Sequence, residues 1–168
     1  GRDAMTLTHN ADNGYTIQDD VNTEGIDTLN NIERINFSDE KLALDINGNA
    51  GITAKTLGAV FGKDSISNKE YVGIGLQLLD GGMSYNDLMK VALNAKLGVN
   101  ASDTDIVNVL YTNVVGTAPS PSDLNYFIGL LQNNTYTTAT LGVFAGETPL
   151  NAENINLIGL TATGLEFI

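Results

Sequence analysis

The chain has 168 residues, with eight Lys or Arg, twenty Asp or Glu and a formal net charge of −12. It contains no Cys and one His, which excludes disulfides, thiolate metal sites, Cys nucleophiles and multi-His zinc sites. Because nucleic-acid phosphates are bound through Lys and Arg, the acidity also argues against a nucleic-acid partner. No run of about 18 apolar residues is present, so we expect no transmembrane segment.

The first part of the chain has the alternation typical of strands. Met5 and Leu7 alternate with threonines, and Asp12-Asn13-Gly14 is a turn signal. Four β-favouring or apolar segments follow one another: 5–9, 15–18, 26–37 and 42–46. A turn at 38–41 separates the last two. These segments predict a small antiparallel sheet of three or four strands.

From Ile52 the apolar residues follow a helical period. The predicted helices are 52–61, 68–80, 85–97, 103–115, 121–132, 138–145 and 152–160. Several begin at a Ser with an acidic residue three positions later, which is a capping signal: Ser67 with Glu70, Ser84 with Asp87, Ser102 with Asp105 and Ser120 with Asp123. The fold class is therefore α+β, with a small antiparallel β-segment over 1–48 and a mainly α-helical two-repeat domain over 49–168.

An internal repeat organises the helical region. The segment LGAVFG…EYVGIGLQLLDGGMSYNDL, 57–88, matches LYTNVVG…LNYFIGLLQNNTYTTATL, 110–141. This alignment pairs Phe61-Gly62 with Val115-Gly116, Leu76 with Leu130 and Leu79 with Leu131. The two copies are expected to pack their apolar faces around a pseudo-twofold axis, with the four leucines buried.

The segment DTLNNIERINFSD, within 27–39, resembles the β-segment that recurs in repeat-in-toxin (hemolysin-type calcium-binding) bacterial proteins. DINGNAG and the helix-loop-helix repeat resemble a helical domain of unknown function near the C-terminus of such proteins. NINLIGLTATGLEFI is similar to their chain ends. The glycine-rich nonapeptide GGxGxDxUx is absent, so we expect any calcium β-roll to lie upstream.

The resemblance implies a secreted, extracellular protein that is exported by type I secretion machinery and folds where calcium is abundant. Residues 1–20 lack the apolar core of a cleaved signal peptide, and the last 72 residues contain no Lys or Arg. The ending Glu166-Phe167-Ile168, an acidic residue followed by apolar ones, resembles the C-terminal secretion signals of these proteins. We expect the export signal within about residues 140–168 and expect the same apolar residues to complete the helical bundle or pair with the small sheet.

One loop has the first half of an EF-hand pattern. Asp20, Asn22, Glu24 and Asp27 place oxygen ligands near alternate positions, and Gly25 occupies the sixth. The closing bidentate Glu is missing, because that position is Asn31. The loop is a candidate calcium site; the alternative is a solvated hairpin turn in which Asp and Asn make local hydrogen bonds.

A second candidate calcium site is Asp45-x-Asn47-x-Asn49, which has the same alternation of oxygens. Its sixth and twelfth positions, Ala50 and Thr56, do not fit the calcium-loop pattern. The segment also lies where strand gives way to helix, so helix capping by these residues is the favoured interpretation.

Aromatic residues lie on or beside the helical repeat. Core packing is the favoured interpretation. The alternative is a groove between the repeats that binds glycan or a surface protein through aromatic and amide side chains. The candidate groove residues are Tyr71, Gln77, Tyr126, Gln132 and Asn133.

Nothing in the sequence assembles a catalytic constellation. His9 is the only His and has no neighbouring nucleophile motif. We therefore predict a non-catalytic C-terminal module that stabilises a larger secreted bacterial protein and carries its export signal, with a link to calcium. The alternative is an adhesin or surface-layer binding module.

Overall fold

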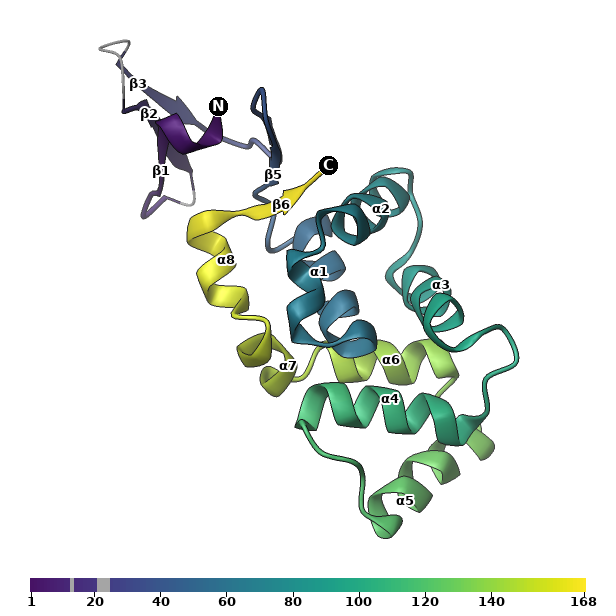
Figure 1. Cartoon of the computed structure of the whole chain (residues 1–168). Helices are drawn as coiled ribbons and strands as arrows, with labels where there is room; N and C mark the ends of the chain where they lie inside the picture. The colour runs from purple at the N-terminus through teal and green to yellow at the C-terminus, as the bar shows by residue number, and fades with distance from the viewer. Residues whose placement is uncertain (13, 21–24) are drawn as a thin grey trace.

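The structure is a computed structural model in which residues 1–12, 14–20 and 25–168 are described. A small β region lies at one end of the molecule and helices form the rest (Figure 1). The predicted α+β class, with a small antiparallel β-segment and a mainly helical remainder, is confirmed.

The β region contains two three-stranded antiparallel sheets in the described part of the chain. The first has the order β1 (Met5–His9), β2 (Tyr15–Asp19), β3 (Ile26–Leu29). The second has the order β4 (Arg34–Asn36), β5 (Lys41–Ala43), β6 (Leu165–Phe167). A single turn of 3-10 helix, η1 (Arg2–Ala4), precedes β1.

The prediction of one small sheet is therefore wrong. Segment 26–37 contains two strands that belong to different sheets. Between them Asn31 has φ of 54°, a left-handed conformation that Asn tolerates better than most residues and that interrupts a strand. The turn between β1 and β2 is closed by the Asn10 N–H, which donates to the Gly14 carbonyl at 2.8 Å; Asn13 lies outside the described residues.

The helical region follows the predicted boundaries closely. Its elements are α1 (Asn49–Phe61), η2 (Lys63–Ser67), α2 (Lys69–Asp80), α3 (Tyr85–Leu97), α4 (Asp103–Val115), α5 (Pro121–Gln132), α6 (Thr138–Gly146), α7 (Pro149–Asn154) and α8 (Leu157–Thr163). The single helix predicted over 152–160 is wrong. Asn156, with φ of 49°, separates α7 from α8.

Side-chain caps begin most of these helices. Ser84, Ser102 and Ser120 each accept a hydrogen bond from the backbone N–H three residues later, as predicted. The predicted Ser67 cap is wrong, because Ser67 ends η2. Asn68 caps α2 instead, and its side-chain oxygen accepts from the Tyr71 N–H at 3.0 Å.

The six central helices form two copies of one three-helix unit, α1–α3 and α4–α6 (Figure 1). Helix α1 packs on α4, and α3 packs on α6. A hydrogen bond of 3.0 Å from the Asn113 side-chain amide to the Ala59 carbonyl joins α4 to α1. Met89, Val107 and Leu141 lie in the core that the two units share.

The caps define the alignment of the two units. Gly62 and Gly116 end α1 and α4, which sets an offset of 54 residues there. The Asn68 and Ser120 caps set an offset of 52 for α2 and α5. The Ser84 and Thr137 caps set an offset of 53 for α3 and α6. The loop between the first two helices is therefore longer in the first unit.

This alignment corrects one of the predicted leucine pairs. Leu79 and Leu131 are equivalent and buried, as expected. Leu76 is buried, but at an offset of 52 its equivalent is Ile128 rather than Leu130. Leu130 is only half-buried and corresponds to Leu78, which is also half-buried.

The last strand returns to the β region. In β6, Leu165 lies opposite Ala43 and Glu166 opposite Leu42. Leu165 and Ile155 are buried in the core formed with α1 and α2. The expectation that the final apolar residues pack into the bundle or pair with the small sheet is thus confirmed for Ile155 and Leu165, but it is wrong for Ile158, which is 89% exposed.

Candidate functional site

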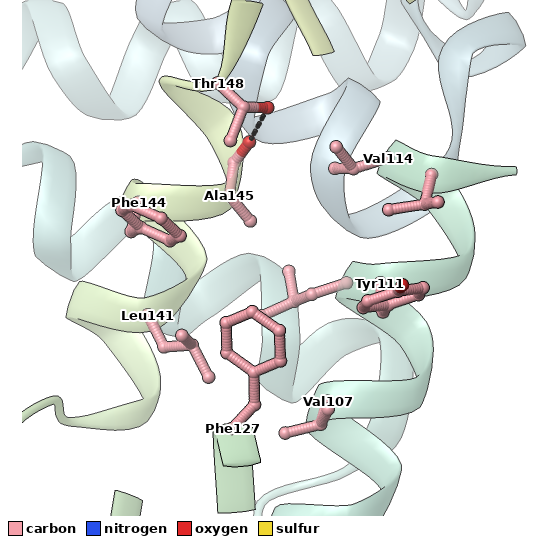
Figure 2. Close-up of a pocket in the computed structure, with 10 residues that line it drawn as sticks. Val107, Tyr111, Val114, Phe127, Leu141, Phe144, Ala145 and Thr148 are labelled. Carbon is pink, nitrogen blue, oxygen red and sulfur yellow. Dashed lines mark hydrogen bonds between the residues drawn. The ribbon is translucent and has the colours of Figure 1, made fainter. Parts of the chain in front are cut away.

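The second three-helix unit contains an apolar pocket, which we call the second-repeat pocket. Helices α4, α5 and α6 and the loop after α6 form its walls. The lining residues are Val107, Leu110, Tyr111, Val114 and Val115 of α4, Phe127 of α5, Leu141, Phe144 and Ala145 of α6, and Thr148 after α6. Its volume is about 110 Å³. In Figure 2 the Phe127 ring lies between Leu141 and Tyr111.

The first unit contains a corresponding cavity, which we call the first-repeat pocket. Its volume is about 170 Å³, and α1, α2 and α3 surround it. The lining includes Thr53, Leu57 and Phe61 from α1 and Leu88 and Val91 from α3.

The two pockets occupy equivalent positions in the repeat. At the offset of 54, four α1 residues of the first pocket correspond to four α4 residues of the second: Thr53 to Val107, Thr56 to Leu110, Leu57 to Tyr111 and Phe61 to Val115. At the offset of 53, four residues in or after the third helix correspond in the same way: Leu88 to Leu141, Val91 to Phe144, Ala92 to Ala145 and Ala95 to Thr148. The pocket is therefore a property of the repeated unit rather than an irregularity of packing at one place.

The middle helix differs between the two pockets. Phe127 of α5 corresponds, at the offset of 52, to Gly75 of α2. A Cβ atom at Gly75 would come within 2.6 Å of the Thr53 methyl carbon, so α2 approaches α1 more closely than a larger residue would allow. In the second unit the Phe127 ring fills part of the corresponding space.

The second-repeat pocket offers no free polar group to a ligand. The Thr148 hydroxyl donates to the Ala145 carbonyl at 2.8 Å, as Figure 2 shows. The Tyr111 hydroxyl donates to Asp123 Oδ2 at 3.2 Å. Desolvation and the Asp123 carboxylate raise the pKa of Tyr111. An apolar cavity of about 150 Å³ accommodates a benzene-sized group, so this pocket suits one apolar side chain.

Large apolar side chains are exposed around both pockets. Val115 and Phe144 are 43% and 47% exposed at the second-repeat pocket. Tyr71, Ile74 and Val91 are 42%, 54% and 42% exposed at the first-repeat pocket. Single exposed apolar residues are common, whereas these residues extend the apolar surface around each cavity.

Among the predicted groove residues, Tyr71 and Gln77 lie on α2, whereas Tyr126, Gln132 and Asn133 lie on α5 or at its end. Figure 1 places α2 and α5 at opposite ends of the helical region. The prediction of one groove formed by these five residues is wrong, because the repeats pack through their first and third helices and leave the middle helices far apart. Val115 and Phe144 were not among the residues predicted from the sequence, although their equivalence to Phe61 and Val91 in the repeat is a signal that could have indicated them.

The first candidate calcium loop joins β2 to β3, and its residues Asn22 and Glu24 lie outside the described residues. Asp20 Oδ1 accepts a hydrogen bond of 2.7 Å from the Thr6 hydroxyl. Asp27 is exposed on β3, opposite Ile17. Gly25 has φ of 103°, in the region that favours glycine. Calcium binding at this loop stays a prediction.

At the second candidate calcium site, Arg34 contacts the predicted ligand Asp45. Its Nη1 donates to Asp45 Oδ1, and its Nη2 donates to Asp80 Oδ1 at 2.9 Å. The Asn49 N–H donates to Asp45 Oδ2 at 2.9 Å, and the Asn49 side-chain amide donates to Asp80 at 2.7 Å, while Asn47 is exposed.

The second predicted calcium site therefore does not form as an oxygen cage. The guanidinium is the cation that the two carboxylates hold, and Asn49 acts as a donor. In the described ranges, no group of three or more His, Cys, Asp or Glu residues is placed to hold a metal ion.

His9 packs on the β region. Its ring lies edge-on to Tyr15, with 4.9 Å between ring centroids. The Tyr15 hydroxyl donates to the Thr161 carbonyl at 2.7 Å and so joins β2 to α8. Burial, followed by the charge of Asp45, raises the pKa of Tyr15.

The predicted secretion-signal residues lie on or just after β6. Lys69 Nζ is 2.9 Å from Glu40 and 2.8 Å from Glu166, and hydrogen bonds to these two carboxylates raise the pKa of Lys69. Phe167 is half-buried with Lys41 Nζ 5.6 Å from its ring centroid, and Ile168 is 59% exposed.

No family model, curated protein or solved structure matches this chain. The resemblance to repeat-in-toxin proteins therefore stays a prediction. Among the described residues, no helix has the length and apolar character needed to cross a membrane.

Proposed function

We propose that the chain is a non-catalytic C-terminal module of a larger secreted bacterial protein, which it stabilises outside the cell while carrying a type I export signal. One observation carries this proposal. Strand β6 completes the sheet whose other strands come from residues 34–43, so the last residues join the β region to the helices. The resemblance of both regions and of the chain end to repeat-in-toxin proteins supports the same role.

The contacts of β6 explain how the tail would stabilise the module. Leu165 is 2% exposed and packs with the buried Ile155 between β5 and the helices. Lys69 joins α2 to Glu40 before β5 and to Glu166 on β6. Burial of these apolar side chains supplies most of the stabilisation, because partly exposed ion pairs contribute little.

The same burial bears on export. In the folded chain the segment 140–168 forms most of α6, all of α7 and α8, and β6, with Leu141, Ile155 and Leu165 buried. A receptor could read these side chains only before the module folds. The arrangement therefore favours a signal that is recognised in the unfolded chain, with folding after export.

The test removes residues 140–168 from the full-length protein in a host with its cognate transporter. Accumulation of the protein in the cytosol supports the proposal, and undiminished protein in the medium overturns the export role. A Leu76→Ala variant with an intact tail is the control for lost stability, because Leu76 is buried in the same core. It should still be exported.

A second role as a surface-binding module is favoured by the two equivalent pockets. Their apolar lining suits a protein partner better than a glycan, because glycan hydroxyls require free hydrogen-bonding groups. Saturable binding of an apolar peptide that Phe144→Ala weakens would support this role.

A further inference from the structure

We infer that the second-repeat pocket docks a basic amphipathic helix of a partner protein, with one apolar side chain of that helix inserted beside Phe127. The inference rests on the binding role proposed above and names the chemistry of the partner. It is independent of the export role, which the tail deletion tests separately.

The shape of the site fits a helix. The pocket is a shallow opening between α4 and α6, with Phe127 of α5 at its base (Figure 2). The exposed side chains Val115 and Phe144 extend the apolar surface beyond the cavity itself. An amphipathic helix binds such a surface through apolar residues at i, i+3 or i+4, one of which fills the cavity.

The charge of the surrounding surface selects the partner. Residues 97–168, which include α4, α5 and α6, contain no Lys or Arg. Asp123 is hydrogen-bonded to the pocket residue Tyr111, whereas Glu147, which precedes the lining residue Thr148, is paired with Lys55 of α1 at 2.8 Å. A carboxylate beside an apolar site, on helices that carry no Lys or Arg, favours a cationic partner and discriminates against an anionic one.

The same charge argues against the other occupants of such a surface. A second copy of the chain would bring together two proteins of net charge −12. An anionic membrane would be repelled in the same way, because attraction to acidic lipids depends on Lys and Arg.

The first-repeat pocket provides an internal comparison. It has equivalent walls, but Lys96 Nζ lies 5.7 Å from the ring centroid of Phe61, which lines it. A basic helix would meet this cation, so we expect it to prefer the second-repeat pocket.

The experiment measures fluorescence anisotropy of a labelled helical peptide of roughly 14 residues that contains only Leu and Lys, with Leu at i, i+3 and i+4 spacing. The full chain should bind it saturably, and added salt should weaken the binding. Phe144→Ala should weaken binding about tenfold, which is typical of a central apolar anchor. The matched variant Val91→Ala, at the equivalent position of the first repeat, should leave binding unchanged.

Charge is tested separately from shape. Asp123→Asn keeps a side-chain oxygen that can accept from the Tyr111 hydroxyl but removes the negative charge. It should weaken binding of the Lys peptide, but it should not weaken binding of a control peptide in which every Lys is replaced by Glu. Equal binding of the two peptides, with Phe144→Ala still weakening both, would overturn the basic partner while leaving the binding role. Absence of saturable binding, or equal effects of Phe144→Ala and Val91→Ala, would overturn the inference. Concentration-dependent dimers by sedimentation, or binding to anionic vesicles, would also overturn it. Unchanged thermal melting of each variant shows that loss of binding is not loss of fold.

Discussion

The alignment of the two repeats predicts that adjacent leucines on α5 differ sharply in their contribution to stability. Leu131 is 8% exposed and packs in the core that both units share, whereas Leu130 is half-buried. Leu131→Ala removes three carbon groups, which at about 0.8 kcal/mol each gives about 2.4 kcal/mol for transfer alone. The cavity left behind raises the expected loss in the free energy of unfolding to about 3 kcal/mol.

Leu130→Ala should cost only about 1 kcal/mol, because much of that side chain already contacts water. Urea unfolding followed by circular dichroism measures both losses, with an unchanged denaturant slope as the check on two-state behaviour. For a protein of this size, a loss of 1 kcal/mol lowers Tm by roughly 2–4 °C. Leu131→Ala should therefore lower Tm by roughly 6–12 °C.

The equivalent pair in the first unit extends the test. Leu79→Ala should behave like Leu131→Ala, and Leu78→Ala like Leu130→Ala, because the offset of 52 equates them. If Leu130→Ala costs as much as Leu131→Ala, the alignment defined by the caps is wrong, and the pairing of Leu76 with Leu130 regains support.

Three further predictions concern close packing, calcium and pH. Gly58→Ala would place a Cβ atom 2.5 Å from the Ile155 methyl carbon and should cost about 1–3 kcal/mol by urea unfolding. In the control Gly129→Ala the added Cβ atom meets no atom within 4 Å, so this substitution should stabilise α5 by about 0.5–1 kcal/mol. Equal changes in the free energy of unfolding for the two substitutions would refute the packing of α7 on α1. Binding of calcium at the 20–27 loop predicts that millimolar calcium raises Tm by mass action and that Asp27→Ala reduces this rise. If a calorimetric titration with calcium gives no heat and Tm does not change, the loop is only a turn. Burial, followed by the charge of Glu147, raises the pKa of Tyr85. Since an unfolded Tyr ionises near pH 10, the stability from this group is complete below about pH 10 and is lost as pH rises above it. Tyr85→Phe should flatten the fall of Tm in alkali and remove a late phase of tyrosinate absorbance at 295 nm, and an unchanged curve would contradict the burial of this hydroxyl.

Local signals in the sequence predicted the helices because the information lies within a few residues of each boundary. The Ser caps at 84, 102 and 120 and the glycines at 62 and 116 satisfy or end backbone hydrogen bonding locally. The division of 152–160 was missed because a left-handed Asn156 leaves no clear mark in an otherwise helical pattern. The α+β class followed from the change of apolar period, and the repeat followed from the match between segments 57–88 and 110–141.

What the tertiary structure decided was which of these elements meet. The pairing of β6 with β5 in the second sheet joins residues more than 120 positions apart, and no local pattern specifies such a partner. The same holds for Arg34, which lies between Asp45 and Asp80 and gives the predicted oxygen cluster a cation from the chain itself. The pockets could be located only once the helices were packed. A cavity is defined by the space that side chains from three helices leave unfilled, and that space depends on helix spacing rather than on residue type. The sequence by itself, however, already determined that residues 97–168, the segment that forms α4, α5 and α6, carry no Lys or Arg.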